Sequence, residues 1–422
     1  MKVIVGLAAV GLILATVFVF LPGGQEVIVR SPQIAIEEVE INSSTTITPP
    51  MAEAAVVSKK DEDIEPQPRL ANPPSEIRAI YITGWSAGLP SRIENIKRLA
   101  KSGLINAVVI DVKDYSGYLS YKTDIELAEE IGAHDEVRFH NPNKLIKELH
   151  DVGLYLIARI SVFQDPKLAF GKPELALSTI NGSIWKDNKG LAWLDPAAQP
   201  VWDYVISIGE DARDRGFDEL NYDYIRFPSD GNLKSIIFPF WNGVAPREEI
   251  MRNFYSYLRN SLKDTKLSAD LFGLVTVRED DLGIGQVLEG VAPYFDAIAP
   301  MVYPSHYGTG FLGFNNPAEH PYEVIDNALE ISLRRLLKLR QSSSSISSQN
   351  NSAVIRPWLQ DFDLGADYDE AKVRAQIEAV EKWQKRYPGA VDGWMLWNAS
   401  NVYTEKALVK KRVINDPVLT TE

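Results

Sequence analysis

The segment that carries the most structural information in this chain reads FDELNYDYIRFPSDG, residues 217–231. Polar and larger apolar side chains alternate over residues 219–224, which is the period of a β-strand with two different faces. Asp223 and Arg226 lie near the end of this strand. A charge in that position is costly unless it is paired or used for chemistry. We therefore expect a functional site where this strand ends.

Seven similar apolar runs surround this segment, and helix-like stretches separate them. The eight predicted strands cover residues 79–85, 107–113, 155–163, 219–227, 267–273, 297–303, 354–360 and 393–399. Several of the intervening stretches, such as VWDYVISIGEDARDRG, end in Gly, as the C-terminus of a helix often does. Eight alternations of strand and helix predict an α/β fold, a (β/α)8 TIM barrel. An open, doubly wound sheet is the alternative.

The segments that follow the predicted strands are long, whereas most segments that enter them are short. Active sites of such barrels lie at the face formed by the segments after the strands. These segments also contain aromatic residues suited to stacking or to packing the loops themselves: Trp185, Trp193, Trp241, Phe311 and Phe314. The Ser-rich stretch 341–353 precedes the seventh strand, so we expect it at the opposite face, as a flexible insertion without a catalytic part.

Polar side chains also recur at alternate positions of other strands. Asp111 and Lys113 share one face of the second strand, and Arg159 lies on the third. Asp270 lies on the fifth strand and Gln360 on the seventh. A barrel lumen built only for stability would be filled with Val, Ile and Leu. The convergence of polar groups therefore predicts a site inside the barrel mouth.

Composition excludes several classes of protein. The formal net charge is -13, which argues against a nucleic-acid partner, because phosphate binding needs a basic surface. The chain has no Cys, so it can form neither disulfides nor thiolate metal sites. It also has no HExxH, paired-His or EF-loop spacing and no GxSxG elbow. We expect neither a metal nor a cofactor.

The N-terminus predicts export. Residues 3–21 contain no charged side chain and are long enough to cross ~30 Å of hydrocarbon as a helix. A transmembrane anchor (1–22) is favoured over a cleaved signal peptide, because no small-x-small exit is clear. Residues 23–75 are rich in Pro, Ser, Thr and Glu and predict a disordered linker. The barrel would span 76–410 outside the cytoplasmic membrane, or be secreted if the segment is cleaved, with 411–422 as a tail.

A set of motifs along the whole predicted barrel resembles the DUF4015 family of glycoside hydrolases. These motifs are NAVVIDVKDYSGYLSY, ARISVFQD, FDELNYDYIRFPSDG, SADLFG, APMVYPSHY, RPWLQDF and GWMLWNAS. The resemblance covers roughly residues 76–405 and includes all eight strands. The family is in turn similar to the alpha-amylase and chitinase-like barrels. It implies a (β/α)8 fold, a carbohydrate substrate and cleavage of a glycosidic bond.

The resemblance to alpha-amylase-like barrels also suggests catalytic roles. Glycoside cleavage commonly uses two carboxyl groups on either side of the bond. In alpha-amylase-like barrels the nucleophile ends strand 4 and the acid ends strand 5, positions that Asp223 and Asp270 occupy here. Asp223 is therefore expected as nucleophile or base and Asp270 as general acid/base. The alternative for Asp223 is a structural ion pair with Arg226 or Arg159.

Other polar residues near the strand ends are candidates for substrate binding. We expect Lys113 to pair with Asp111 and to lower its pKa. Arg159 and Arg226 are expected to orient the carboxylates. Tyr303, His306 and Gln360 lie where strands 6 and 7 meet their loops, and either Trp397 or Asn398 is expected beneath the sugar.

Three functions fit these residues. The first is a glycoside hydrolase acting on a polysaccharide or cell-envelope glycan. The second is a glycan-binding barrel that has lost the chemistry. The third is a hydrolase or lyase of another envelope polymer.

Overall fold

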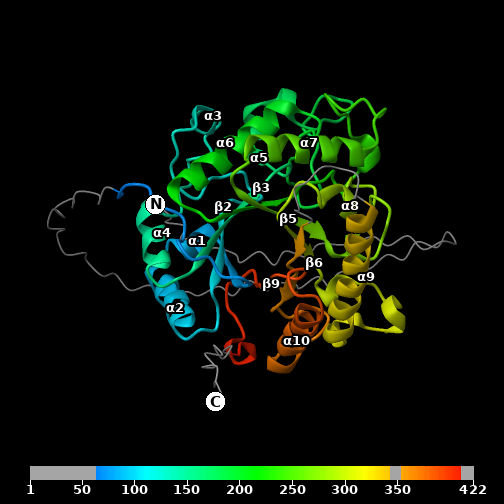
Figure 1. The fold of residues 1–422 in the computed structure, drawn as a ribbon. Coiled ribbons are helices and arrows are strands. Elements are labelled where there is room, and N and C mark those ends of the chain that lie inside the picture. Colours follow the sequence, from blue (N-terminus) through cyan, green and yellow to red (C-terminus); the bar gives the residue numbers. More distant parts are fainter. Residues whose placement is uncertain (1–62, 343–352, 410–422) are drawn as a thin grey trace, which may run out of the picture.

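The computed structural model describes residues 63–342 and 353–409, and in them a closed parallel sheet surrounds a central lumen (Figure 1). The strand order is β5-β4-β3-β2-β1-β9-β8-β6-β7, and β5 also pairs with β6. The strands are β1 (Ile77–Ile82), β2 (Ala107–Lys113), β3 (Tyr155–Ser161), β4 (Glu219–Asp223), β5 (Lys266–Phe272), β6 (Ala297–Met301), β7 (Val354–Ile355), β8 (Trp358–Gln360) and β9 (Gly393–Trp397). The β5–β6 pairing closes the sheet, so the predicted barrel is confirmed and the open sheet is excluded.

The seventh predicted strand is interrupted by a proline. Pro357 separates β7 from β8 because proline has no N–H to donate to the neighbouring strand. Its carbonyl still accepts a hydrogen bond from Met395 N at 3.0 Å. Strands β7 and β8 therefore act as one of the eight barrel strands.

The fourth strand is shorter than the sequence predicts. Tyr224 has φ of 53°, in the left-handed region, so β4 ends at Asp223. The chain turns there, and Arg226 lies in the following loop instead of on the strand. Asp223 is thereby the last residue of β4, at the barrel mouth.

Closure of the barrel depends on one glycine. Gly393 begins β9 beside Ile77 of β1 with φ of 82°. A Cβ at this position would lie 1.7 Å from the carbonyl oxygen of Ile77, closer than any real contact. Only glycine therefore lets the first and last strands meet.

Helices surround the sheet (Figure 1). They are α1 (Gly84–Ala87), α2 (Pro90–Lys101), α3 (Glu126–Glu130), α4 (Pro142–His150), α5 (Pro166–Gly171), α6 (Gln199–Arg215), α7 (Arg247–Ser261), α8 (Leu288–Val291), α9 (Pro321–Ser342) and α10 (Glu370–Arg386). In α6 the buried residues Val201, Val205, Ile208 and Ala212 recur at helical spacing. Gly216, with φ of 115°, ends this helix as the sequence predicts.

Residues 63–75, which the sequence assigns to the linker, contact the barrel. The carboxylate of Asp63 accepts hydrogen bonds from the N–H groups of Asn143 and Lys144 at the start of α4, at 2.9 and 3.0 Å. Leu70 N donates to Asp218 Oδ1 at 2.6 Å, just before β4. This segment therefore lies along the helical layer and reaches the base of the barrel.

Three further predictions fall wholly or mostly outside the described residues. The expected anchor (3–21) and most of the expected linker are among them, as is most of the Ser-rich insertion. No helix within 63–342 or 353–409 is both long and apolar enough to span a bilayer.

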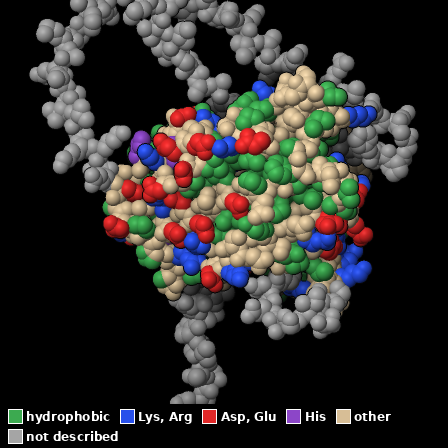
Figure 2. Space-filling model, turned by 90° about the horizontal axis from the view of Figure 1, so that it is seen from above, with side chains coloured by type: hydrophobic (Ala, Val, Ile, Leu, Met, Phe, Trp, Pro, Cys, Tyr) green, Lys and Arg blue, Asp and Glu red, His purple; other side chains and the backbone are tan. Residues whose placement is uncertain are grey.

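The surface over α6 and α7 is unevenly charged. Figure 2 shows this side of the molecule, where acidic side chains gather over one half. Hydrophobic patches lie between them, and basic side chains are more scattered. The excess of acidic residues in the sequence is thus visible on this face.

Candidate active site

Three carboxyl groups surround one arginine at the mouth of the barrel. Arg159 on β3 donates from Nη1 to Asp111 Oδ1 at 2.7 Å and from Nη2 to Asp223 Oδ2. Its Nε lies 3.6 Å from Asp270 Oδ2. The exposed fractions of Asp111, Arg159, Asp223 and Asp270 are 1%, 5%, 5% and 1%. Arg159 therefore holds in one buried cluster the carboxyl groups that three different strands contribute.

The strand register explains why these groups meet. Arg159 pairs with Asp111 of β2 on one side and with Asn221 of β4 on the other. Asp223 and Asp270 lie nearer to the strand ends on the same inward alternation. The sequence alternation thus correctly predicts the lumen side for this cluster.

Asp270 has the environment of a protonated acid. Its Oδ1 accepts hydrogen bonds from Asn221 Nδ2 at 2.8 Å and from Trp358 Nε1 at 2.7 Å. Burial and then the negative charge of Asp223 raise the pKa of Asp270 to about 8. The two hydrogen bonds and the positive charge of Arg159 act in the opposite direction and only reduce the rise of this pKa.

Asp223 receives two hydrogen-bond donors. Arg159 binds Oδ2, and the N–H of Tyr224 donates to Oδ1 at 2.6 Å. Asp223 and Asp270 both contact one guanidinium group, which keeps them within the ~10 Å separation that a two-carboxyl mechanism allows.

The expected pairing of Asp111 with Lys113 is wrong. The register of β2 against β3 shifts between these two residues, so Lys113 leaves the alternation of Asp111. Lys113 is fully buried, pairs with Asp165 at 2.8 Å and donates to Ser161 O at 2.6 Å. It fastens the loop after β3 and is enclosed by protein.

The expected lowering of the Asp111 pKa is also wrong. Burial raises the pKa of Asp111, although Arg159 opposes this and the Tyr81 hydroxyl donates to its Oδ2. Without Lys113 nearby, Asp111 shares the single cation of the cluster with two other carboxyl groups.

Arg226 does not orient a carboxylate. No described carboxylate lies within 4 Å of it, and its guanidinium group lies against the rings of Trp193, Tyr224 and Phe272. The left-handed Tyr224 redirects the chain before Arg226, so the expected role beside Asp223 is not observed.

Tyr303 and His306 come from the segment after β6. Tyr303 is 6% exposed and contacts the rings of His306 and Phe362 edge-on. The charges of Asp270 and Asp223 act on Tyr303, whose pKa burial raises, so it lies beside the carboxyl cluster. Burial, followed by the charge of Lys189, lowers the pKa of His306 to about 4, so its ring is neutral at pH 7.

The side chains of Gln360 and Trp397 differ in their exposure to solvent. The Gln360 side chain is fully buried, accepting from Ser305 N at 3.1 Å and donating to Phe362 O at 2.9 Å, so it joins two loops. Trp397 is partly exposed and lies 5.1 Å from the Arg159 guanidinium carbon. Of the two predicted candidates, Trp397 faces the mouth, while Asn398 donates to Asp361 O.

Tyr81 belongs to the cluster but was not predicted. It stacks on Trp397 with ring centroids 3.9 Å apart, and its hydroxyl reaches Asp111. The alternation of β1 with Ala79 inward could have placed it in the lumen. By contrast, the loop residues Trp185 and Trp193 are 2% and 1% exposed and pack the loops themselves.

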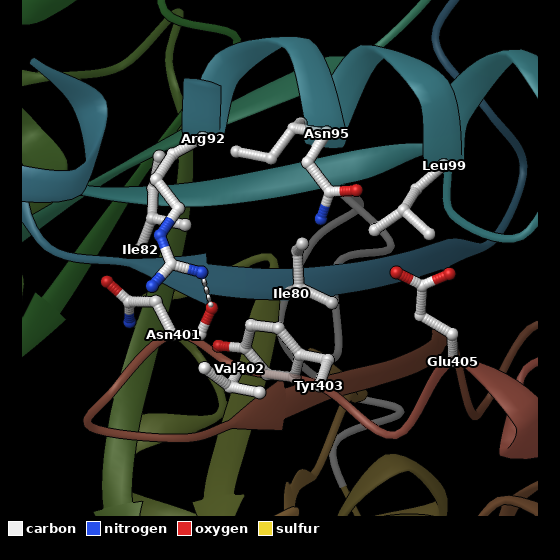
Figure 3. A pocket seen from close by; sticks show the side chains of 10 residues that line it. Ile80, Ile82, Arg92, Asn95, Leu99, Asn401, Val402, Tyr403 and Glu405 are labelled. Carbon is white, nitrogen blue, oxygen red and sulfur yellow. Dashed lines mark hydrogen bonds between the residues drawn. The ribbon is translucent and has the colours of Figure 1, made fainter. Parts of the chain in front are cut away.

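A cavity of about 90 Å³ lies outside the barrel, away from these carboxyl groups (Figure 3). It is between α2 and residues 401–405, and Arg92 from α2 donates to the carbonyl of Asn401 across it. Ile80 and Ile82 line it with their outward-facing side chains. Glu405 is the one carboxylic acid among its lining residues, so the cavity has no acid pair, and we place the candidate site at the mouth.

No cluster of three or more metal-ligating side chains occurs in residues 63–342 and 353–409.

Two solved structures are among those similar to this chain. A hypothetical protein from Ruminiclostridium thermocellum ATCC 27405 is 39% identical over 48% of this chain and 98% of its own, with a TM-score of 0.42. The PgaB (BpsB) glycoside hydrolase domain from Bordetella bronchiseptica is 14% identical over 80% of this chain and 100% of its own, with a TM-score of 0.52. The second likeness supports the fold.

A search of curated proteins gave no match. The family model DUF4015, described as "Putative glycosyl hydrolase domain", matches residues 79–403. This match includes every barrel strand except the first two residues of β1. The chain belongs to the DUF4015 family of glycosyl-hydrolase-like domains.

Proposed function

We propose that the protein cleaves glycosidic bonds, with Asp270 as general acid/base and Asp223 as nucleophile or base. The family assignment supports a carbohydrate substrate. The observation that carries the proposal is the contrast between two neighbouring carboxyl groups. Asp270 keeps its proton to a pKa of about 8, while Asp223 is held by a guanidinium and a backbone N–H. Such a contrast assigns acid and base.

In this mechanism the carboxyl proton of Asp270 passes to the oxygen of the leaving sugar. Asp223 then either bonds to the anomeric carbon or removes a proton from the attacking water. Arg159 stabilises Asp223 and keeps it near Asp270. Trp397 and Tyr81 provide a stacked aromatic wall beside the cluster.

A glycan-binding barrel without catalysis is the second candidate. The observation in its favour is the low exposure of both carboxyl groups, 5% for Asp223 and 1% for Asp270. In this case Arg159 and its carboxylates would serve only to close the mouth.

Hydrolysis of a polysaccharide panel, measured as reducing ends released, separates the two candidates. Asp223→Asn should lower kcat on the order of 10³-fold or more while glycan binding persists. Asn cannot act as nucleophile or base, but it keeps the shape of the side chain. Binding without any release by the wild-type protein would favour the second candidate, and unchanged turnover in Asp223→Asn would remove this residue from the mechanism.

We also propose that residues 3–21 hold the barrel outside the cytoplasmic membrane, with secretion after cleavage as the alternative. Fractionation of cells expressing the full chain tests this. The anchor requires the uncleaved protein in the membrane fraction, and release of a shortened chain into the medium would support cleavage.

A further inference from the structure

Arg226 is a buried cation beside the candidate active site. Its exposed fraction is 7%. Its guanidinium carbon lies 4.6, 4.8 and 5.4 Å from the ring centres of Phe272, Trp193 and Tyr224. Aromatic faces attract a cation, but they do not use its N–H donors.

Half of this guanidinium group has no protein partner. Nη1 donates to the carbonyl of Phe227 at 3.1 Å and to Ser229 Oγ at 3.2 Å. Within the described chain, Nε and Nη2 make no hydrogen bond. Both atoms reach solvent, because neither is enclosed by protein. Nε and Nη2 form the edge of the group that binds a carboxylate through two parallel hydrogen bonds.

The position of Arg226 relates this free edge to the carboxyl cluster. Phe272, which lies under the guanidinium, follows Asp270 by two residues on β5 and shares its inward alternation. Arg226 itself follows Asp223 by three residues, and the charge of Asp223 acts on it. The free edge therefore borders the mouth on the side of β4 and β5.

Lys189 provides a second positive charge in the same region. Asp187 accepts hydrogen bonds from Lys189 N at 2.9 Å and from Trp193 Nε1 at 3.0 Å, and Trp193 lies against Arg226. The Lys189 ammonium has no described carboxylate within 4 Å. Burial lowers its pKa, and the negative charges of Asp187 and Asp230 oppose this lowering. Its charge also acts on His306 across the mouth.

The Nε and Nη2 donors of Arg226 are left unused by the protein and reach solvent, so they are open to an external acceptor. A planar carboxylate fits two parallel N–H donors. We propose that Arg226, assisted by Lys189, binds the carboxylate of a uronic-acid residue, so that the substrate is an acidic glycan. This inference rests on the proposed function and specifies its substrate class. Local cations are needed, because the net charge of -13 repels a polyanion over longer distances.

Binding of matched oligosaccharides tests the inference. The full-length protein is titrated with oligomers of galacturonate, glucuronate and mannuronate, each paired with its carboxyl-reduced form. At least one acidic oligomer should bind about 10-fold or more tightly than its reduced form, the range expected for a charge-assisted contact. Arg226→Met should abolish this ratio, and Arg226→Lys should restore part of it, because Lys keeps the charge but loses the two-donor edge.

Arg247→Met is the matched control. Arg247 also lies on two aromatic rings, those of Phe227 and Trp241, at the start of α7. This variant should keep the acid preference of the wild-type protein. Thermal unfolding of each variant shows whether a lost ratio reflects the contact or a lost fold, and an unfolded Arg226→Met leaves the decision to Arg226→Lys.

Several outcomes would overturn the inference. Equal affinity for every acidic and reduced pair contradicts it, as does an acid preference that both Arg226 variants retain. Arg226-dependent binding of dextran sulfate over dextran, without uronate binding, would identify a sulfated glycan instead. Cleavage of neutral glycans with no acid preference would leave the hydrolase proposal standing and remove this inference. Arg226-dependent uronate binding without cleavage of any glycan would support this inference and remove the hydrolase proposal.

Discussion

The lumen of the barrel contains two arginine-centred clusters, and they differ in their balance of charge. At the base, Arg356 pairs with Glu219 at 2.7 Å and with Asp392 at 2.6 Å. At the mouth, Arg159 contacts three carboxyl groups. At the base Nη1 and Nη2 of the guanidinium each donate to one carboxylate. At the mouth the third carboxyl group, that of Asp270, lies 3.6 Å from Arg159 Nε, and its raised pKa favours the protonated form.

This difference shows that one barrel can contain, within a few residues, an ion cluster with two carboxylates for its cation and another with three carboxyl groups for its cation. Arg356 and Trp358 are two residues apart on the same interrupted strand. Arg356 closes the base, whereas Trp358 donates to the acid at the mouth. The two clusters differ in the number of carboxyl groups that surround each arginine. Variants of these residues can change that number.

Removing the central cation of the mouth should have the largest effect. Arg159→Met leaves three buried carboxyl groups without a cation, so we expect a loss of about 5 kcal/mol in the free energy of unfolding at pH 8, together with loss of activity. Without the cation, the pKa values of the native carboxyl groups rise above their unfolded values, and stability therefore falls as pH rises. Urea unfolding at pH 5 and pH 8 measures this, and a loss that is independent of pH would contradict the charge explanation.

The equivalent change at the base should be smaller. Arg356→Met should lower the free energy of unfolding by about 3 kcal/mol, because Glu219 stays buried without a cation while Asp392 partly reaches solvent. The fraction that remains folded should keep the kcat of the wild-type protein. A kcat reduced as far as in Arg159→Met would erase the distinction between the two clusters.

Asp270→Asn tests whether the Asp270 carboxyl group is protonated in the folded protein. The pKa of Asp270 is about 8 when folded and near 3.8 when unfolded, so between these values the native state holds the extra proton. Wild-type stability should therefore fall with rising pH by up to about 1.4 kcal/mol per unit, and Asp270→Asn should remove this slope. Denaturant unfolding at pH 5 to 8 measures the slopes.

The same variant has an activity readout. Loss of the general acid should reduce kcat by about 10²- to 10⁴-fold. Wild-type activity should decline as pH rises past about 8, because Asp270 then loses its proton. Constant wild-type activity up to pH 10 would exclude Asp270 as the acid.

The smallest expected effect is the change that Asp223→Asn makes in the pKa of Asp270. The charge of Asp223 is the second cause of the raised Asp270 pKa, after burial. Removing it should lower that pKa by about one unit. Carboxyl ¹³C NMR of the labelled protein follows the titration, and an Asp270 pKa that stays at its wild-type value would mean that the two groups do not interact.

Much of the fold could be predicted from the sequence, because strand alternation and helix-ending glycines are local signals. All eight barrel strands lie where the apolar runs indicate. The break at Pro357 and the early end of β4 were missed, since they depend on a missing N–H and on the φ angle of Tyr224.

The site was predictable only as a set of inward-facing polar residues. The sequence places Asp111, Arg159, Asp223 and Asp270 in the lumen, and the structure brings them together. The sequence could not show which side chains form pairs. The partner of Lys113 depends on a register shift, and the free edge of Arg226 depends on three aromatic rings from separate segments. Pairing is a tertiary property with no fixed spacing.

The closure at Gly393 has a consequence for folding during synthesis. Strand β1 can complete its pairing only after β9, near the end of the barrel, has left the ribosome. Until then an edge of β1 is unpaired and able to join another chain. Tyr403 then donates its hydroxyl to the carbonyl of Tyr81, so even the residues after β9 contribute to holding that edge. A chain truncated before residue 393 would keep Asp223 and Asp270 but leave both edges of the sheet open to aggregation.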